Sequence, residues 1–198
     1  MNDKTRLNRR DVQRRFDRAA TTFDGADFVH AVTRQGLLER LLPLVVDATA
    51  VLDLGAATGD ATQALRQRFG GAHIVSFDLS HDMLRRCAGK RRWWWRANEV
   101  QGDATRMPFA DNSFDVIFAN LLLPWIDEPA AVFEEVARVL RRGGVFAFAT
   151  LGPDSLLQLA RAWAEVDGDA HVHQFLDMHD VGDAALRAGL SDPVLDVD

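Results

Sequence analysis

The chain has 198 residues and a formal net charge of −6, and 47% of its residues are hydrophobic against 26% charged, which indicates one domain with a buried core and excludes a disordered chain. No apolar run approaches the roughly 20 residues that span a bilayer, and the start MNDKTRLNRR lacks the apolar stretch of a secretory signal, so we expect a soluble, cytoplasmic protein without membrane contact. A single cysteine, Cys87, excludes an internal disulfide, and the six histidines show no zinc-ligand spacing, so we expect no metal.

The first 45 residues predict a helical extension. Residues 8–20 form an amphipathic pattern in which Val12, Phe16 and Ala19 or Ala20 recur at helical spacing between arginines. Residues 28–42 continue in the same way with a stripe of leucines, and Pro43 follows as a stop signal.

From position 50 short apolar runs alternate with helical stretches. Strands are predicted at 50–55, 73–79, 98–103, 114–123 and 143–151, and the helices between them at 59–68, 80–88 and 129–140. Such alternation indicates βαβ units and a parallel sheet covered on both faces. We therefore predict a doubly wound, mostly parallel α/β fold of the Rossmann-like type.

The last part of the chain predicts two more helices, at 155–166 and at 179–189, where Gly189 fits a C-cap. Residues 193–198 read as the start of a further strand, so the final strand of the sheet is missing. We expect a truncated chain, a fragment or an unusually short protein. The organisation we predict is a single domain, 1–198, with a helical extension (1–45), a cofactor-binding core (46–152) and substrate-side helices (153–198).

Acidic residues end the first three predicted strands. Asp53 precedes the turn GAATG at 55–59, whose glycines allow a ligand close to the backbone, while Asp78 fits an acceptor for two ribose hydroxyls. Asp103 fits an acceptor for an adenine amino group. Asp60, directly after the turn, would repel a pyrophosphate, so the pattern favours a ligand without phosphate, such as an adenosyl sulfonium.

The segments VLDLGAATG, SFDLS and GDATRMPFADNSFDVIFANLLLPWI resemble the class I S-adenosylmethionine-dependent methyltransferases. Within them, RRFDRAATTFD at 14–24 and ATLGPDSLLQLARAWAEVDGDAHVHQFLD at 149–177 are similar to the malonyl-acyl-carrier-protein O-methyltransferase family of bacterial biotin synthesis. This resemblance covers about residues 9–198. It implies an enzyme that transfers a methyl group from S-adenosylmethionine to the free carboxylate of a malonyl thioester on acyl carrier protein.

The resemblance also implies roles for individual residues. It assigns the cofactor loop to Asp53, Gly55 and Gly59, the ribose to Asp78, the flanks of the adenine to Leu79 and Met83, the adenine face to Asp103 and Ala104, and the loop beneath the methionine portion to Asn120 and Leu121. Two positions depart from the family pattern. Ala57 replaces the middle glycine of the turn, and Phe23 stands where relatives often have tyrosine.

Acceptor binding is less specified by the sequence. Trp125, just beyond the fourth strand, is a candidate wall of the acceptor pocket, and His171 or His173 is a candidate substrate contact. Arg34 is a candidate for the methionine carboxylate, against the alternative of a surface charge. No general base is predicted, because a malonyl carboxylate is ionised at neutral pH.

Two basic clusters interrupt the acidic chain and are a hypothesis for docking an acidic carrier protein, with solvated helix faces as the alternative. The first is Lys4, Arg6, Arg9, Arg10, Arg14, Arg15 and Arg18, and the second, beside Trp93, Trp94 and Trp95, is Arg85, Arg86, Lys90, Arg91, Arg92 and Arg96.

Two alternative functions stay open. One is another small-molecule or protein-modifying methyltransferase, related to a complex I assembly factor. The other is a truncated, non-catalytic cofactor-binding domain. Nucleic-acid methylation is disfavoured, because ANLLLPW lacks an Asn/Asp-Pro-Pro-aromatic signature and the chain is acidic.

Overall fold

The computed structural model describes residues 7–44, 46–90, 98–167, 172 and 175–197. Its strands are β1 (Ala50–Leu54), β2 (His73–Asp78), β3 (Glu99–Gln101), β4 (Phe114–Asn120) and β5 (Leu140–Ala149). Its helices are α1 (Arg9–Ala19), α2 (Phe28–Leu41), α3 (Asp60–Arg68), α4 (His81–Gly89), α5 (Pro129–Val139), α6 (Leu157–Ala164) and α7 (Met178–Arg187), with short 3-10 turns η2 (Phe23–Gly25) and η3 (Leu123–Trp125).

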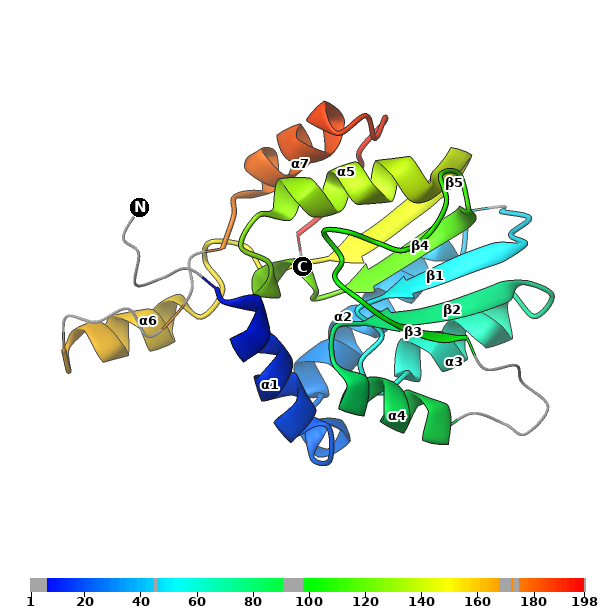
Figure 1. Ribbon diagram of the computed structural model, residues 1–198. Helices are drawn as coiled ribbons and strands as arrows, with labels where there is room; N and C mark the ends of the chain where they lie inside the picture. The colour runs from blue at the N-terminus through cyan, green and yellow to red at the C-terminus, as the bar shows by residue number, and fades with distance from the viewer. Residues whose placement is uncertain (1–6, 45, 91–97, 168–171, 173–174, 198) are drawn as a thin grey trace.

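The strands form one parallel sheet in the order β3-β2-β1-β4-β5, which confirms the predicted doubly wound fold. The chain enters the sheet at its centre, builds outward to β3, and then returns to place β4 on the other side of β1. Ligands of open α/β sheets bind at the carboxyl ends of the strands where the order reverses in this way. In Figure 1 this edge faces α1.

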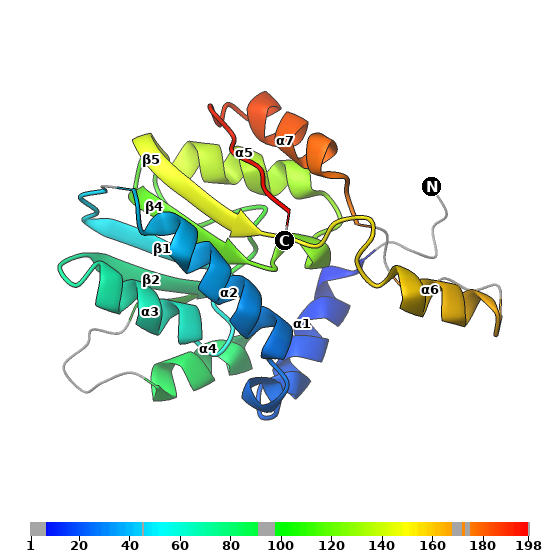
Figure 2. The ribbon, with the colours of Figure 1, turned by 180° about the vertical axis from the view of Figure 1, so that it is seen from behind.

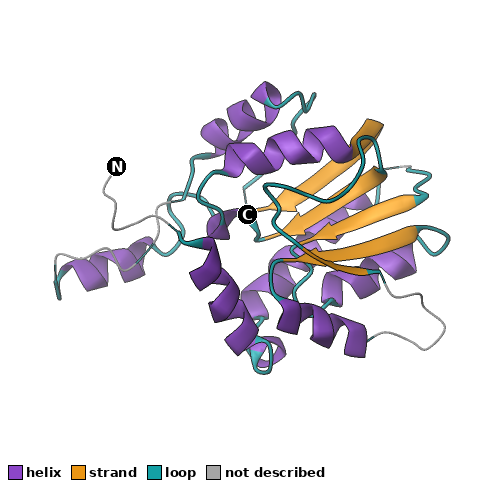
Figure 3. Cartoon of the chain, in the orientation of Figure 1, coloured by secondary structure: helices purple, strands orange, loops and turns teal. Residues whose placement is uncertain are grey.

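Helices cover both faces of the sheet (Figure 3). On one face α5 and α7 enclose a core that includes the fully buried Phe77 and Phe133. On the other face, which Figure 2 shows in front, α2 and α3 pack Leu41 and Leu65 against Val51 and its neighbours. Apolar side chains therefore point both ways from the central strands, as expected for a parallel sheet buried on both sides.

The N-terminal helix α1 is fixed beside the carboxyl edge of the sheet by polar contacts. Asn8 caps the helix, because its side-chain oxygen accepts a hydrogen bond from the Arg10 amide at 2.9 Å. Asp17 accepts a hydrogen bond from the Ser80 hydroxyl at 2.6 Å and so joins α1 to the start of α4. The predicted helical extension thus forms one wall of the site.

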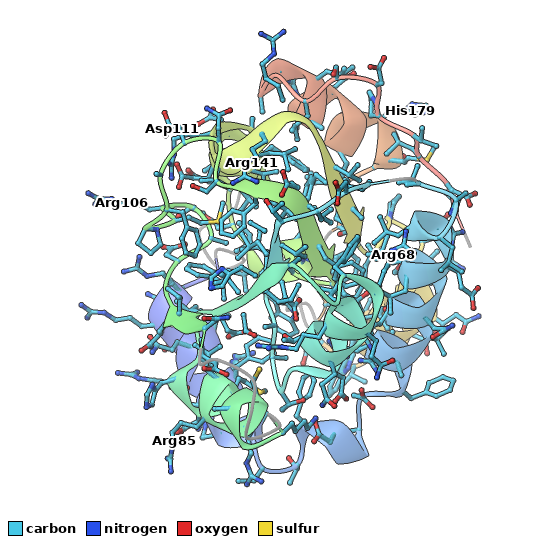
Figure 4. All side chains as sticks on the ribbon, turned by 90° about the vertical axis from the view of Figure 1, so that its right-hand side faces the viewer. Arg68, Arg85, Arg106, Asp111, Arg141 and His179 are labelled. Carbon is cyan, nitrogen blue, oxygen red and sulfur yellow. The ribbon has the colours of Figure 1, made fainter. Side chains whose placement is uncertain are left out.

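The amino ends of the strands, onto which Figure 4 looks, are joined by Asp115 and Arg141. Asp115 also accepts hydrogen bonds from the backbone amides of Thr49 and Ala50, at 2.8 and 2.9 Å. Although burial opposes it, hydrogen bonds from Arg141 and these amides lower the pKa of Asp115 to about 2. This cluster holds β1, β4 and β5 together at the edge opposite the site.

The predicted strand at 193–198 is wrong for the residues that the structure describes, because 193–197 lie in no strand. Side-chain contacts hold this segment instead of a ladder. The carboxylate of Asp196 pairs with Arg40 of α2 at 2.7 Å, and the Leu195 side chain packs closely on Gly182 of α7. Pro193 cannot donate a ladder hydrogen bond.

Candidate functional site

A cavity of about 790 Å³ opens between α1 and the carboxyl ends of the strands, a size typical of small-molecule sites. One side is polar and is formed by Gly55, Ala57, Asp78, Leu79, Asp103, Ala104 and Thr105. The other side is mainly apolar and is formed by Val12, Phe16, Phe23, His30, Leu121, Leu122, Trp125 and Ile126. The cavity therefore joins a polar part to an apolar part.

The turn between β1 and α3 brings backbone to the cavity. Gly55 has a φ of +81° and Ala57 a φ of +46°, and both line the cavity. Ala57, which replaces the usual glycine, therefore occupies a left-handed conformation that strains a residue with a Cβ. Its backbone amide donates a hydrogen bond to the Asp78 carboxylate at 2.9 Å.

Asp78 ends β2 and is fixed by two backbone amides. Its Oδ2 accepts from Ala57 and its Oδ1 accepts from Ser80 at 2.8 Å. Burial raises the pKa of Asp78, and these hydrogen bonds oppose that rise. The carboxylate therefore lies at the cavity wall in one fixed orientation, with lone pairs left to accept from a ligand.

Asp103 follows β3 on the same edge. Its Oδ1 accepts hydrogen bonds from the amide and hydroxyl of Thr105, while its Oδ2 accepts from Arg9 of α1 at 2.5 Å. Burial opposes the shift, but these contacts lower the pKa of Asp103. Asp103 is thus ionised at neutral pH and bonded to the helix that covers it.

Asn120, at the end of β4, has a buried side-chain oxygen with no hydrogen-bond partner in the described structure. Its Nδ2 donates to the His30 carbonyl at 3.0 Å, which fixes the amide plane. Such an orphaned acceptor is costly unless a ligand supplies a donor. Together with the Asp78 carboxylate, it fits a ligand that carries hydroxyl and ammonium donors.

Aromatic rings line the apolar part of the cavity. The Phe16 ring lies edge-on to Trp125 with centroids 5.0 Å apart, and 6.5 Å from Phe23. Phe23 in turn lies 5.0 Å from the imidazole of His30. Burial lowers the pKa of His30, so the imidazole is neutral at pH 7. These half-buried rings make this end of the cavity apolar, and Trp125 is the candidate acceptor wall among them.

Asp53 lies behind the cavity. Its carboxylate is 1% exposed, accepts from the Thr62 hydroxyl at 2.5 Å, and borders a small cavity of about 30 Å³ that also contacts Arg34 and Asn120. Burial raises the pKa of Asp53 to about 7, with the nearby Asp78 acting in the same direction. Asp53 is therefore a partly protonated residue at neutral pH that supports the turn from below.

This pKa predicts how stability depends on pH. A carboxyl group with a folded pKa raised above its unfolded value favours the native state when protonated, so its contribution is lost as pH rises from about 4 to 7. We expect Asp53→Asn to remove this dependence, which is at most about 1.4 kcal/mol per pH unit for one proton. Urea unfolding at several pH values would measure it. Parallel pH profiles of the variant and the parent chain would contradict the prediction.

Other predicted residues lie elsewhere. Met83 is fully buried on the inner face of α4 and is not among the residues that line the cavity. Gly59, with a φ of +88°, packs on Cys87 of α4. Arg34 borders the small cavity, where it pairs with Asp27 at 3.4 Å and approaches Asp60 at 3.9 Å. His171 and His173 lie outside the described residues, as do Trp93, Trp94, Trp95 and the arginines at 91, 92 and 96.

Sequence reasoning did not place Phe16 or His30 in the site. Phe16, Phe23 and His30 recur at intervals of seven in the first 30 positions, which is the one regularity that links them in the sequence. This spacing could not have placed them in the site, because the three residues lie on the separate elements α1, η2 and α2. The sequence predicts Lys90 as a docking charge, but its amine turns inward and pairs with Asp24 and Asp60 at 2.9 and 2.7 Å.

No helix in the described ranges is long and apolar enough to cross a membrane. Within those same ranges, no three His, Cys, Asp or Glu side chains are grouped so that they could hold a metal ion.

Comparison with known proteins identifies relatives. A family profile described as a methyltransferase domain matches residues 52–148. The malonyl-[acyl-carrier protein] O-methyltransferase of Halorhodospira halophila is 42% identical over 98% of the chain, and that of Laribacter hongkongensis is 43% identical over 94%; the chain spans 66% of the length of each. The enzyme of the same name from Gallionella capsiferriformans is 32% identical over 97% of the chain and 68% of its own length.

Solved structures agree on the fold. A chain of the complex between the Haloferax volcanii Trm112 methyltransferase activator and its methyltransferase partner superposes with a TM-score of 0.72, at 25% identity, over 90% of this chain and 75% of that one. An S-adenosylmethionine-dependent methyltransferase from Thermotoga maritima gives a TM-score of 0.66 at 19% identity, over 88% and 79% of the two chains.

Proposed function

We propose, since this chain belongs to the malonyl-[acyl-carrier protein] O-methyltransferase family, that it methylates the free carboxylate of a malonyl thioester carried on acyl carrier protein, in biotin synthesis. The methyl donor is S-adenosyl-L-methionine. One observation carries the proposal: Asp78, Asp103 and Asn120, whose side-chain oxygen has no partner among the described residues, line the same cavity as a set of apolar rings.

The donor supplies an electrophilic methyl group on a sulfonium. In our proposal Asp78 accepts from both ribose hydroxyls, and the Asn120 oxygen accepts from the ammonium of the methionine portion. The donor has no phosphate, which suits a turn followed by Asp60 rather than by a cation. The remaining assignments are Gly55 and Ala57 for the backbone approach, Leu79, Asp103 and Ala104 for the adenine, Leu121 for the floor, and Arg34 for the methionine carboxylate.

The reaction needs no base from the protein. A malonyl carboxylate is ionised at pH 7, so its oxygen forms the bond to the methyl carbon while the carbon–sulfur bond breaks and its electron pair stays on sulfur. No proton moves. Positioning can contribute roughly 7–11 kcal/mol to such a step. Because opposite charges disappear in it, the apolar wall of Phe16, Phe23 and Trp125 favours it further.

The carrier protein is proposed to dock on α1 and α4, which lie side by side in Figures 1 and 2. Exposed arginines at 14, 18 and 85 lie on these helices. Their partners within the described residues, where present, are exposed acids one turn away, at 3.5 Å for Arg14 and 3.4 Å for Arg85. Such pairs are weak and leave the charge available to an acidic partner.

Calorimetric titration of the chain with S-adenosyl-L-methionine, followed by addition of malonyl carrier protein and mass spectrometry, tests the proposal. We expect binding and a mass gain of one CH₂ on the malonyl group. Binding without transfer would contradict the reaction and favour a non-catalytic domain. A folded chain that does not bind the donor would contradict the cofactor site itself.

A further inference from the structure

The charged groups that line the large cavity are mostly acidic. Asp78, Asp103, Asp127 and Glu128 contribute carboxylates, and the described lining residues include two cations, Arg9 and Arg10. His30 adds no charge, because burial lowers its pKa. An anionic acceptor therefore needs a cationic donor on this wall, and a guanidinium is geometrically suited to hold its carboxylate.

The two arginines differ in what they contact. Arg9 donates to Asp103 at 2.5 Å, so its charge is already matched by a carboxylate. The Arg10 backbone amide donates to the Asn8 cap, but within the described residues its guanidinium makes no hydrogen bond or ion pair. Arg10, which lines the cavity at the N-terminal end of α1, thus carries a planar donor that is unmatched within the described residues.

The start of α1, which carries Arg10, lies close to the segment that forms the acceptor end of the cavity. The start of the chain is bonded to the segment after η3, since the Leu7 amide donates to Asp127 at 3.4 Å. Trp125 and Ile126 precede Asp127 and line the same cavity. The first turn of α1 therefore reaches the apolar acceptor end through Leu7 as well as Asp103 through Arg9.

We infer that Arg10 anchors the carboxylate of the methyl acceptor and so selects malonyl over uncharged acyl groups, an inference that rests on the proposed function. The anchor has a kinetic signature. The carboxylate loses its charge as the ester forms, so Arg10 binds the ground state at least as well as the transition state. Removing such an interaction raises KM and does not lower kcat.

The test uses malonyl-N-acetylcysteamine, a short thioester whose only charge is the malonyl carboxylate, so that carrier docking plays no part. We expect Arg10→Gln to raise KM for this acceptor roughly 10- to 100-fold, which is the range for a lost hydrogen bond to a charged group, with kcat unchanged. Arg10→Lys should restore part of the loss, since it keeps the charge without the fork. The Kd for S-adenosyl-L-methionine should not change in either variant.

Arg187→Gln is the matched control, because this exposed arginine of α7 is not among the residues that line the large cavity. A KM of Arg10→Gln equal to that of the control would overturn the inference, as would a fall in kcat with unchanged KM. A rise in KM seen only with carrier-bound malonyl would also overturn it, by making Arg10 a docking residue. Absence of transfer by the parent chain would instead contradict the proposed function, so the two failures are distinguishable.

Discussion

Replacing Asp78 with asparagine should weaken the binding of S-adenosyl-L-methionine roughly 100-fold or more, because two hydrogen bonds to a charged acceptor each contribute about 1.5–3 kcal/mol. The substitution keeps the shape of the side chain but removes its charge. It also turns an amide donor toward one of the two backbone amides, of Ala57 and Ser80, that now donate to it. Calorimetry at constant ionic strength would measure the change in Kd.

A second ligand distinguishes the contribution of the ribose to binding from that of the sulfonium. S-adenosylhomocysteine has the same ribose but no positive charge, so we expect Asp78→Asn to weaken both ligands by the same factor. A loss confined to the sulfonium ligand would place Asp78 beside the methyl group and contradict our assignment. Asp82→Asn is the control, since this carboxylate pairs with exposed Arg85 on α4 and is not among the residues that line the large cavity.

The sheet and its polar edge were predictable because they depend on local pattern and on one rule of topology. Apolar runs alternating with helical stretches fix a parallel sheet, and parallel strands bring their carboxyl ends to one edge. Asp53 lies one residue before the end of β1, Asp78 ends β2 and Asp103 follows β3, so the sequence predicts them close together. The structure separates their environments, with Asp53 beneath the turn and the other two at the cavity.

What the sequence could not predict depends on tertiary contacts. Met83 lies on the same helix as exposed residues, and only the packing of α4 on the sheet decides that it faces the core. The pair of Arg9 and Asp103 joins positions 94 residues apart. Residues 193–197 have strand-like composition, but contacts of Leu195 and Asp196 with α7 and α2 determine their path. In each case a neighbour distant in sequence overrides a local preference.

Gly59→Ala should lower the free energy of unfolding by roughly 2–5 kcal/mol, through two separable causes. The φ of +88° strains any residue with a Cβ, and the new Cβ would clash with the Cys87 sulfur. Gly143→Ala is the matched control, because Gly143 has a φ of +77° but nothing within 4 Å of an added Cβ. It should show the backbone cost alone, about 1–2 kcal/mol.

The double variant Gly59→Ala/Cys87→Ala separates the second cause. Removing the sulfur opens space where the new methyl group would go, although the Cys87 Cβ and Cα remain 3.0 and 3.2 Å away. We therefore expect the double variant to lose less unfolding free energy than the sum of the two single losses, by about 1 kcal/mol or more. Urea unfolding of the four chains measures this coupling. If the losses of unfolding free energy were strictly additive, Gly59 would be needed only for the backbone conformation of the turn. Its close packing against Cys87 of α4 would then contribute nothing to the effect of the substitution.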